Sequence, residues 1–279
     1  MATTKLTELG MDFIKKTCSA AGASLLQGKN SYVLPYALPV PTSSYVWVSH
    51  ATFNGKPIVT NQQLGEALIS WYNKYAQIYE IDANVMAAQG FVESGYKIWN
   101  YAKTSTASGI SQFTVQAVFD IIIENRGSQY KFTQDEINAI TKNIQGNLKN
   151  YDGTFSVSTT LGKQNRSILH QNIIDNPEIM VKAQCRYMRK ISDDYGTKLG
   201  SNILFGYNRG PAYIRSNYTD TINNTVNKTY SGYEEEGIDY VWKIYTNLFN
   251  NFGYKHLNMN QKPEEFNAFQ ADVDGSSKE

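Results

Sequence analysis

The segment AQGFVESGY, residues 88–96, places one carboxylate, Glu93, at the end of an apolar helical pattern and directly before a Ser-Gly stop. The C-terminal end of a helix disfavours an anion by about 0.3–1 kcal/mol, and the apolar neighbours Phe91 and Val92 add desolvation. Both effects are expected to raise the pKa of the Glu93 carboxyl. Because a general acid must hold a proton at neutral pH, we interpret Glu93 as a candidate acid, although a lone Glu more often lies on a solvated face.

No second carboxylate lies close to Glu93 in the sequence, since the chain has no Asp or Glu between Glu93 and Asp120. A hydrolase that works with two carboxylates needs a partner roughly 5–10 Å from the acid, either as nucleophile or to activate water. A residue from a distant part of the chain could supply that partner. The local sequence fits a mechanism with a single carboxylate better.

Three motifs follow one another along the chain: AQGFVESGY, then ASGISQF at 107–113, then FGYNRGP at 205–211. In this order they resemble the three signatures of the lysozyme-like lytic transglycosylases. Two further segments, 176–196 and 239–245, are similar to the helix before the family's Tyr-Asn motif and to its closing Tyr-Val helix. The resemblance covers about residues 62–253 and implies a lysozyme-like helical domain.

The resemblance also implies an activity and assigns roles to individual residues. Members of the family cleave the β-1,4 bond between N-acetylmuramic acid and N-acetylglucosamine in peptidoglycan and close a 1,6-anhydro ring, without metal or cofactor. Glu93 matches the single catalytic acid/base, which protonates the leaving oxygen and then takes the proton of the muramoyl C6 hydroxyl. The residues that match substrate-binding positions are Ser94, Gln112, Tyr207, Asn208 and Tyr240.

The chain departs from the family pattern at several positions. Ser111 stands where the family has Met, and the usual Pro is missing at Thr114. Neither Thr104 nor Ser105 aligns with the family's substrate-facing Ser. These departures leave open a catalytically inactive structural protein of a virion or an adaptor. A hydrolytic muramidase on the same fold, which would use a distant carboxylate and water, is a second alternative.

Hydrophobic periodicity predicts a mainly α fold in three parts. Residues 1–61 are interpreted as an N-terminal extension with a β-hairpin around Asn54-Gly55, which is a strong hairpin pair. Residues 62–253 are expected to form the lysozyme-like domain, within which 151–172 is predicted to be irregular. Residues 254–279 are expected to form a mobile tail.

Three expected helices begin with characteristic residues. Asp82 precedes the helix of Glu93 as an N-cap. Thr133 and Glu136 have the spacing of a capping box, and Pro177 opens a later helix. These patterns predict where helices begin without reference to the rest of the fold.

Charge and composition limit the partners that we expect. The 26 basic and 25 acidic residues give a net charge of +1, so nucleic acid and anionic membranes are not expected partners. We see no targeting segment and no membrane span. Because peptidoglycan lies outside the cytoplasm, we expect a protein that is synthesised in the cytoplasm without a signal peptide and acts at the bacterial cell wall. A bacteriophage virion component fits this expectation, with residues 1–60 docking to a tail or baseplate.

Other residue types that can carry chemistry are interpreted as structural. The stripe of Trp71, Tyr75 and Tyr79 could line a glycan groove but fits a helix core better. Cys185 lies in an amphipathic helix and is expected in the core. The histidines show no metal-ligand spacing and are expected on the polar surface: His50, His170 and His256.

Overall fold

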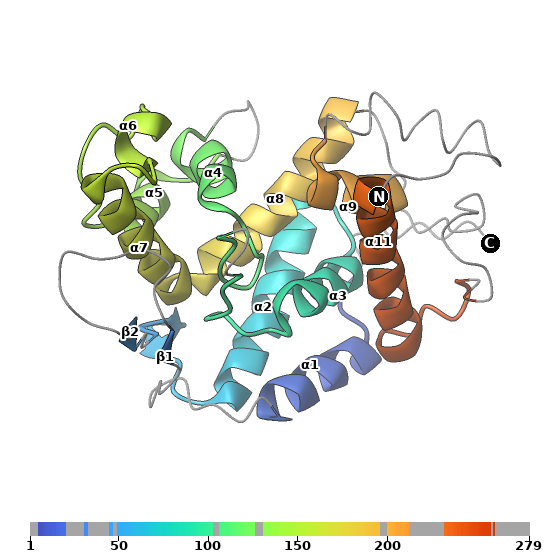
Figure 1. Cartoon of the computed structure of the whole chain (residues 1–279). Helices are drawn as coiled ribbons and strands as arrows, with labels where there is room; N and C mark the ends of the chain where they lie inside the picture. The colour runs from blue at the N-terminus through green and yellow to red at the C-terminus, as the bar shows by residue number, and fades with distance from the viewer. Residues whose placement is uncertain are drawn as a thin grey trace. The chain divides into compact units, whose positions relative to one another are not determined.

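The computed structural model describes residues 5–20, 31–32, 45–46, 49–102, 106–125, 131–195, 200–211, 232–257 and 259 (Figure 1). The expectation of a mainly α fold is confirmed. The helices are α1 (Glu8–Ala20), α2 (Asn61–Tyr79), α3 (Ala83–Ser94), α4 (Val115–Val118), the π-helix η1 (Phe119–Ile123), α5 (Gln134–Thr141), α6 (Tyr151–Phe155), α7 (Thr160–Asp175), α8 (Pro177–Tyr195), α9 (Gly200–Arg209) and α11 (Gly232–Asn251). The strands are β1 (Ser31–Tyr32), β2 (Tyr45–Val46), β3 (Thr52–Phe53) and β4 (Lys56–Pro57).

The chain forms two compact units, each assembled from separate segments. Unit 1 consists of residues 1–14, 69–92 and 184–279, and unit 2 consists of residues 15–68 and 93–183. The limits of both units fall inside the helices α1, α2, α3 and α8.

In unit 1, the first residues of the chain are bound to helices that come much later in the sequence. The backbone N–H of Leu6 donates to Asn73 Oδ1 at 2.7 Å, and that of Thr7 donates to Asn84 Oδ1 at 2.9 Å. The Thr7 hydroxyl donates to the carbonyl oxygen of Phe252 at 3.2 Å. Residues 5–14, which the sequence assigned to an extension, therefore belong to this helical unit.

The end of unit 1 is also packed beyond α11. The Tyr254 hydroxyl donates a hydrogen bond to Oδ2 of Asp82, a fully buried residue. Leu257 is buried as well. The segment assigned to a tail thus begins with packed residues, and 260–279 lie outside the described residues.

In unit 2, two pairs of short antiparallel strands are present. β1 pairs with β2, and β3 pairs with β4. Between β3 and β4, Asn54 and Gly55 have φ values of 52° and 74°. Two successive positive φ angles are typical of a two-residue type I′ turn, a conformation that Asn-Gly adopts readily.

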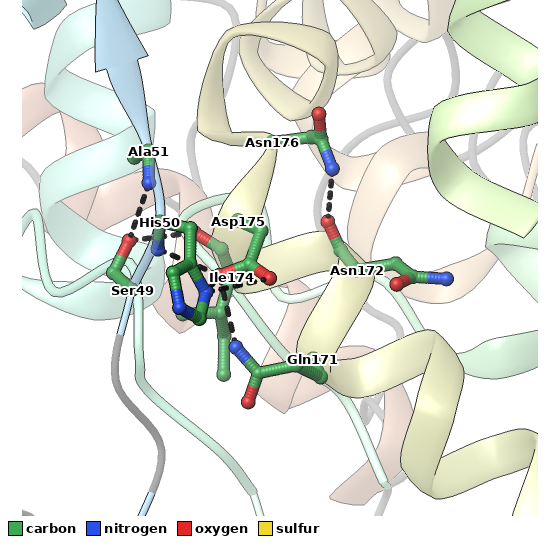
Figure 2. Close-up of polar contacts among 8 residues, drawn as sticks. All are labelled: Ser49, His50, Ala51, Gln171, Asn172, Ile174, Asp175 and Asn176. Carbon is green, nitrogen blue, oxygen red and sulfur yellow. Dashed lines mark hydrogen bonds and ion pairs between the residues drawn. The ribbon is translucent and has the colours of Figure 1, made fainter. Parts of the chain in front are cut away.

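The residues just before β3 are fixed to the end of α7 in the same unit. The Ser49 hydroxyl donates to the Ile174 carbonyl oxygen at 3.2 Å, and the His50 backbone N–H donates to Asp175 Oδ1 at 2.8 Å (Figure 2). The Gln171 amide donates to the same Asp175 oxygen at 2.9 Å. Asp175 therefore holds the strand segment against the helix through side-chain and backbone donors.

The prediction that residues 151–172 are irregular is wrong, because they form α6 and most of α7. The buried face of α7 mixes aliphatic residues such as Leu169 and Ile173 with polar ones, which weakens its hydrophobic periodicity. Asn165 and Asn172 are buried, and both donate to backbone carbonyl oxygens in the stretch 140–154. Hydrogen bonds of this kind offset the cost of burying an amide.

The predicted helix starts are confirmed. Asp82 Oδ1 accepts the Asn84 backbone N–H at 2.8 Å just before α3. Both hydrogen bonds of the capping box between Thr133 and Glu136 are present at α5, and α8 begins at Pro177.

Candidate functional site

Glu93 lies in the last turn of α3, as its position before the Ser-Gly pair predicted. All residues from 81 to 90 are buried, whereas the Glu93 side chain is half-buried. After Ser94 the helix ends, with φ values of 61° at Gly95 and 62° at Tyr96. The helix therefore runs from a fully buried stretch to a partly exposed residue, Glu93.

Ser94, the residue expected to orient Glu93, is 6% exposed. Its carbonyl oxygen accepts the backbone N–H of Lys97 at 3.2 Å, which tightens the turn after the helix. Tyr96 is buried although its φ is positive, a conformation that is uncommon for a residue other than glycine. Packing of the Tyr96 ring therefore holds the chain in the turn that follows Glu93.

Gln112 is half-buried in the second motif and also has a positive φ, 47°. Its Nε2 donates to the carbonyl oxygen of Gly109 at 2.8 Å and to that of Asn100 at 3.2 Å. These two bonds use both N–H groups of the amide. Gln112 thus connects the backbone at Asn100 with that at Gly109, and any further contact of its side chain goes through the carbonyl oxygen Oε1.

The two departures from the family pattern in this loop have local structural partners. Ser111 is fully buried, and its hydroxyl donates to the Met180 carbonyl oxygen at 2.9 Å. Thr114 is the N-cap of α4, where its hydroxyl oxygen accepts the Ala117 backbone N–H at 3.2 Å. A buried Met would leave that carbonyl without this donor, and a Pro would lack the capping oxygen.

In unit 1, the third motif ends the helix α9. Tyr207 and Asn208 are half-buried, and Gly210 follows with a φ of 99°. The ring of Tyr207 lies 5.3 Å from the ring of Tyr187, measured between centroids. Asn208 Oδ1 accepts a hydrogen bond from Nε of the next residue, Arg209, at 2.6 Å.

Tyr240 lies on α11 in unit 1 and is 7% exposed. Its hydroxyl oxygen accepts a hydrogen bond from Nε2 of the fully buried Gln89 at 2.9 Å. Gln89 Oε1 in turn accepts from Nε2 of Gln184 at 2.8 Å, which also donates to the Met86 carbonyl oxygen at 3.2 Å. This buried network ties α3, α8 and α11 together one helical turn before Glu93.

The sequence interpretation missed Gln89 and Gln184. The pattern that could have pointed to Gln89 is a polar amide inside the apolar run of the Glu93 helix. Burial of an amide requires partners, but the sequence does not say which residues supply them.

Unit 2 contains three of the predicted site residues, Glu93, Ser94 and Gln112. Unit 1 contains the others, on two helices that pack against each other, α9 with Tyr207 and Asn208 and α11 with Tyr240.

The residues interpreted as structural are mostly buried. Trp71, Tyr75 and Tyr79 belong to the core, as expected. Cys185 is fully buried, and burial raises the pKa of its thiol well above the ordinary value, so the thiolate needed for nucleophilic attack is disfavoured. The expectation of a surface position is wrong for His170, which is fully buried on α7.

Within the described ranges, no helix combines the length and the apolar character that crossing a bilayer requires. The same part of the chain holds no group of three or more His, Cys, Asp or Glu side chains arranged to hold a metal ion.

Comparison of the chain with protein-family models, with curated proteins and with solved structures gave no match.

Proposed function

We propose that the protein is a peptidoglycan lytic transglycosylase in which Glu93 is the single general acid/base. The observation that carries this proposal is the setting of Glu93, a half-buried residue in the last turn of α3, after the buried stretch 81–90. This end of a helix disfavours negative charge, which suits a group that must hold a proton. The order of the three motifs supports the same function.

In the proposed reaction, Glu93 gives its proton to the glycosidic oxygen of N-acetylglucosamine as the bond from that oxygen to C1 of N-acetylmuramic acid breaks. The N-acetyl group of the substrate stabilises the intermediate. The Glu93 carboxylate then takes the proton of the muramoyl C6 hydroxyl while O6 bonds to C1 and closes the 1,6-anhydro ring. Glu93 regains its proton and no water is consumed, so a second carboxylate is not needed.

The departures at Ser111 and Thr114 are compatible with a working site. Each of the two departures supplies a hydrogen bond that the loop uses, so neither implies that catalysis has been lost. The hydrolytic muramidase and the inactive virion or adaptor protein stay as alternatives that the products of the reaction distinguish.

Under this proposal the protein acts at the bacterial cell wall as a bacteriophage virion component. Docking to a tail or baseplate would fall to the part of residues 1–60 that follows residue 14, because residues 5–14 are packed in unit 1. Mass spectrometry of purified virions tests this location. Virions that lack the protein while infected cells contain it would contradict it.

The activity is tested by incubating purified protein with peptidoglycan sacculi and measuring the soluble muropeptides released. Wild-type protein is expected to release them, and Glu93→Gln is expected to release none, since an amide cannot transfer the proton. Glu66→Gln is the matched control, because Glu66 is exposed on α2 and interacts with Gln62 one turn away. Equal release by wild type and Glu93→Gln would contradict the role of Glu93.

A further inference from the structure

We propose that Arg209 is a positioning residue that fixes the Asn208 amide with its N–H groups toward the ligand, so that this position binds a carbonyl oxygen. The inference rests on the proposed function, because Asn208 is assigned to the glycan site through its motif. It adds the chemical class of the group that Asn208 recognises, and it names residues outside the predicted set, Arg209 and Glu236.

The orientation of the Asn208 amide follows from its partner. Arg209 Nε lies 2.6 Å from Asn208 Oδ1. A guanidinium has donors only, so the atom facing it must be the amide oxygen. The amide nitrogen Nδ2, with its two N–H groups, therefore points away from Arg209. Asn208 is half-buried, so the residue is partly accessible.

Arg209 is itself held by α11. Its Nη2 forms an ion pair with Glu236 Oε1 at 2.6 Å, and its side chain is 9% exposed although that of Glu236 is 64% exposed. One planar guanidinium thus contacts Asn208 on its own helix and Glu236 on the neighbouring helix. A Lys side chain is a point charge without this fork and cannot reproduce both contacts in the same geometry.

The residue after Glu236 is Gly237, which leaves room for the Arg209 side chain. A Cβ atom added at Gly237 would lie 2.7 Å from Arg209 Cγ and 2.5 Å from the ring of Phe205. The aliphatic part of Arg209 therefore lies directly on the backbone of α11, and any side chain at position 237 would push it away. Arg209 thus contacts α11 both through its aliphatic part at Gly237 and through its guanidinium at Glu236.

Peptidoglycan offers carbonyl oxygens of two origins to such a donor. One is the acetamido group of each sugar, and the other is the lactyl-peptide stem of muramic acid.

Loss of a hydrogen bond to a neutral group weakens binding roughly three- to tenfold, and a carboxylate in place of the amide would also repel a carbonyl oxygen. Asn208→Asp is nearly isosteric, keeps an oxygen for Arg209 and removes both N–H groups.

Isothermal titration calorimetry with two probes tests the inference. The probes are the tetramer of N-acetylglucosamine, which has acetamido groups and no stem, and a muramoyl tripeptide, which also has the stem carbonyls. Asn208→Asp and Arg209→Lys are expected to weaken binding of both probes by roughly tenfold if the acetamido group is recognised. They are expected to weaken binding of only the muramoyl tripeptide if the stem is recognised.

A third variant, Gly237→Ala, changes no polar group and is expected to weaken binding in the same direction, because it displaces the Arg209 side chain. Thermal unfolding of each variant shows whether the protein remains folded.

Wild-type affinity for both probes in folded Asn208→Asp would overturn the inference, and so would a wild-type protein that binds neither probe. Muropeptide release is measured separately, so unchanged binding by Asn208→Asp together with normal release would overturn this inference alone. A clear binding difference without any release from sacculi would overturn the proposed function alone.

Discussion

The buried His170 makes the stability of the protein sensitive to acid in a way that can be calculated. Burial and, to a smaller extent, the charge of Arg166 lower the pKa of this imidazole to about 3, against the opposing effect of a backbone hydrogen bond at Thr106. In the unfolded chain a histidine has a pKa of about 6.5. Between these two pKa values the unfolded state binds one proton more than the folded state. The free energy of unfolding therefore falls as the pH falls through this window, by about 1.4 kcal/mol per pH unit.

The assay is urea unfolding at several pH values between about 7 and 4.5, with wild type compared with His170→Gln. Glutamine removes the ring that lies 5.1 Å from the ring of Tyr101, so the variant is expected to be less stable at neutral pH. The prediction concerns the slope of the free energy of unfolding against pH. The carboxylates contribute equally to this slope in both proteins. The curves of wild type and variant should therefore converge by about 1.4 kcal/mol for each pH unit below about 6.5.

Parallel curves for wild type and His170→Gln over this range would show that the ring is not kept neutral by burial. The same replacement at the exposed His256 is the matched control for the removal of one histidine. If the unfolding free energies of wild type and the His256 variant also converged as the pH falls, the assignment of this pH dependence to His170 would be contradicted.

Three further substitutions test individual contacts through the free energy of unfolding in urea. Gly162→Ala places a methyl group about 2.0 Å from the carbonyl oxygen of Ser156, and overpacking of this kind is expected to lower stability by about 2 kcal/mol or more. Thr133→Ala removes the capping box of α5 and should lower stability by about 1 kcal/mol. Gln89→Leu removes the donor to Tyr240 and the acceptor of a second buried amide and should lower stability by about 1–3 kcal/mol. A loss below about 0.5 kcal/mol, the range of ordinary surface substitutions, would contradict the contact concerned.

The features that the sequence predicted depend on contacts between residues that lie close together in the chain. A cap such as Asp82, or the pair Thr133 and Glu136, satisfies backbone N–H groups two or three positions away. The end of α3 after Glu93 depends on the Ser-Gly pair beside it. Such patterns can be recognised without knowledge of any distant contact.

The features that the sequence did not predict depend on distant partners. The helix α7 buries Asn165, His170 and Asn172, which look like surface residues until their packing is known. Similarly, Gln89 meets Tyr240 across a separation of 151 residues. Hydrophobic periodicity detects apolar faces, so a helix that buries hydrogen-bonded amides beside its aliphatic residues is harder to recognise.

The proposed chemistry is tested most directly by mass spectrometry of the muropeptides released from sacculi in ¹⁸O-labelled water. A lytic transglycosylase is expected to yield products one water lighter than those of hydrolysis, without ¹⁸O at the new muramoyl end, and Glu93→Gln is expected to yield none. Products with ordinary reducing ends that carry ¹⁸O would contradict the transglycosylase and identify a hydrolytic muramidase. No products from wild-type protein on several types of sacculus would contradict an enzymatic role and favour the structural one.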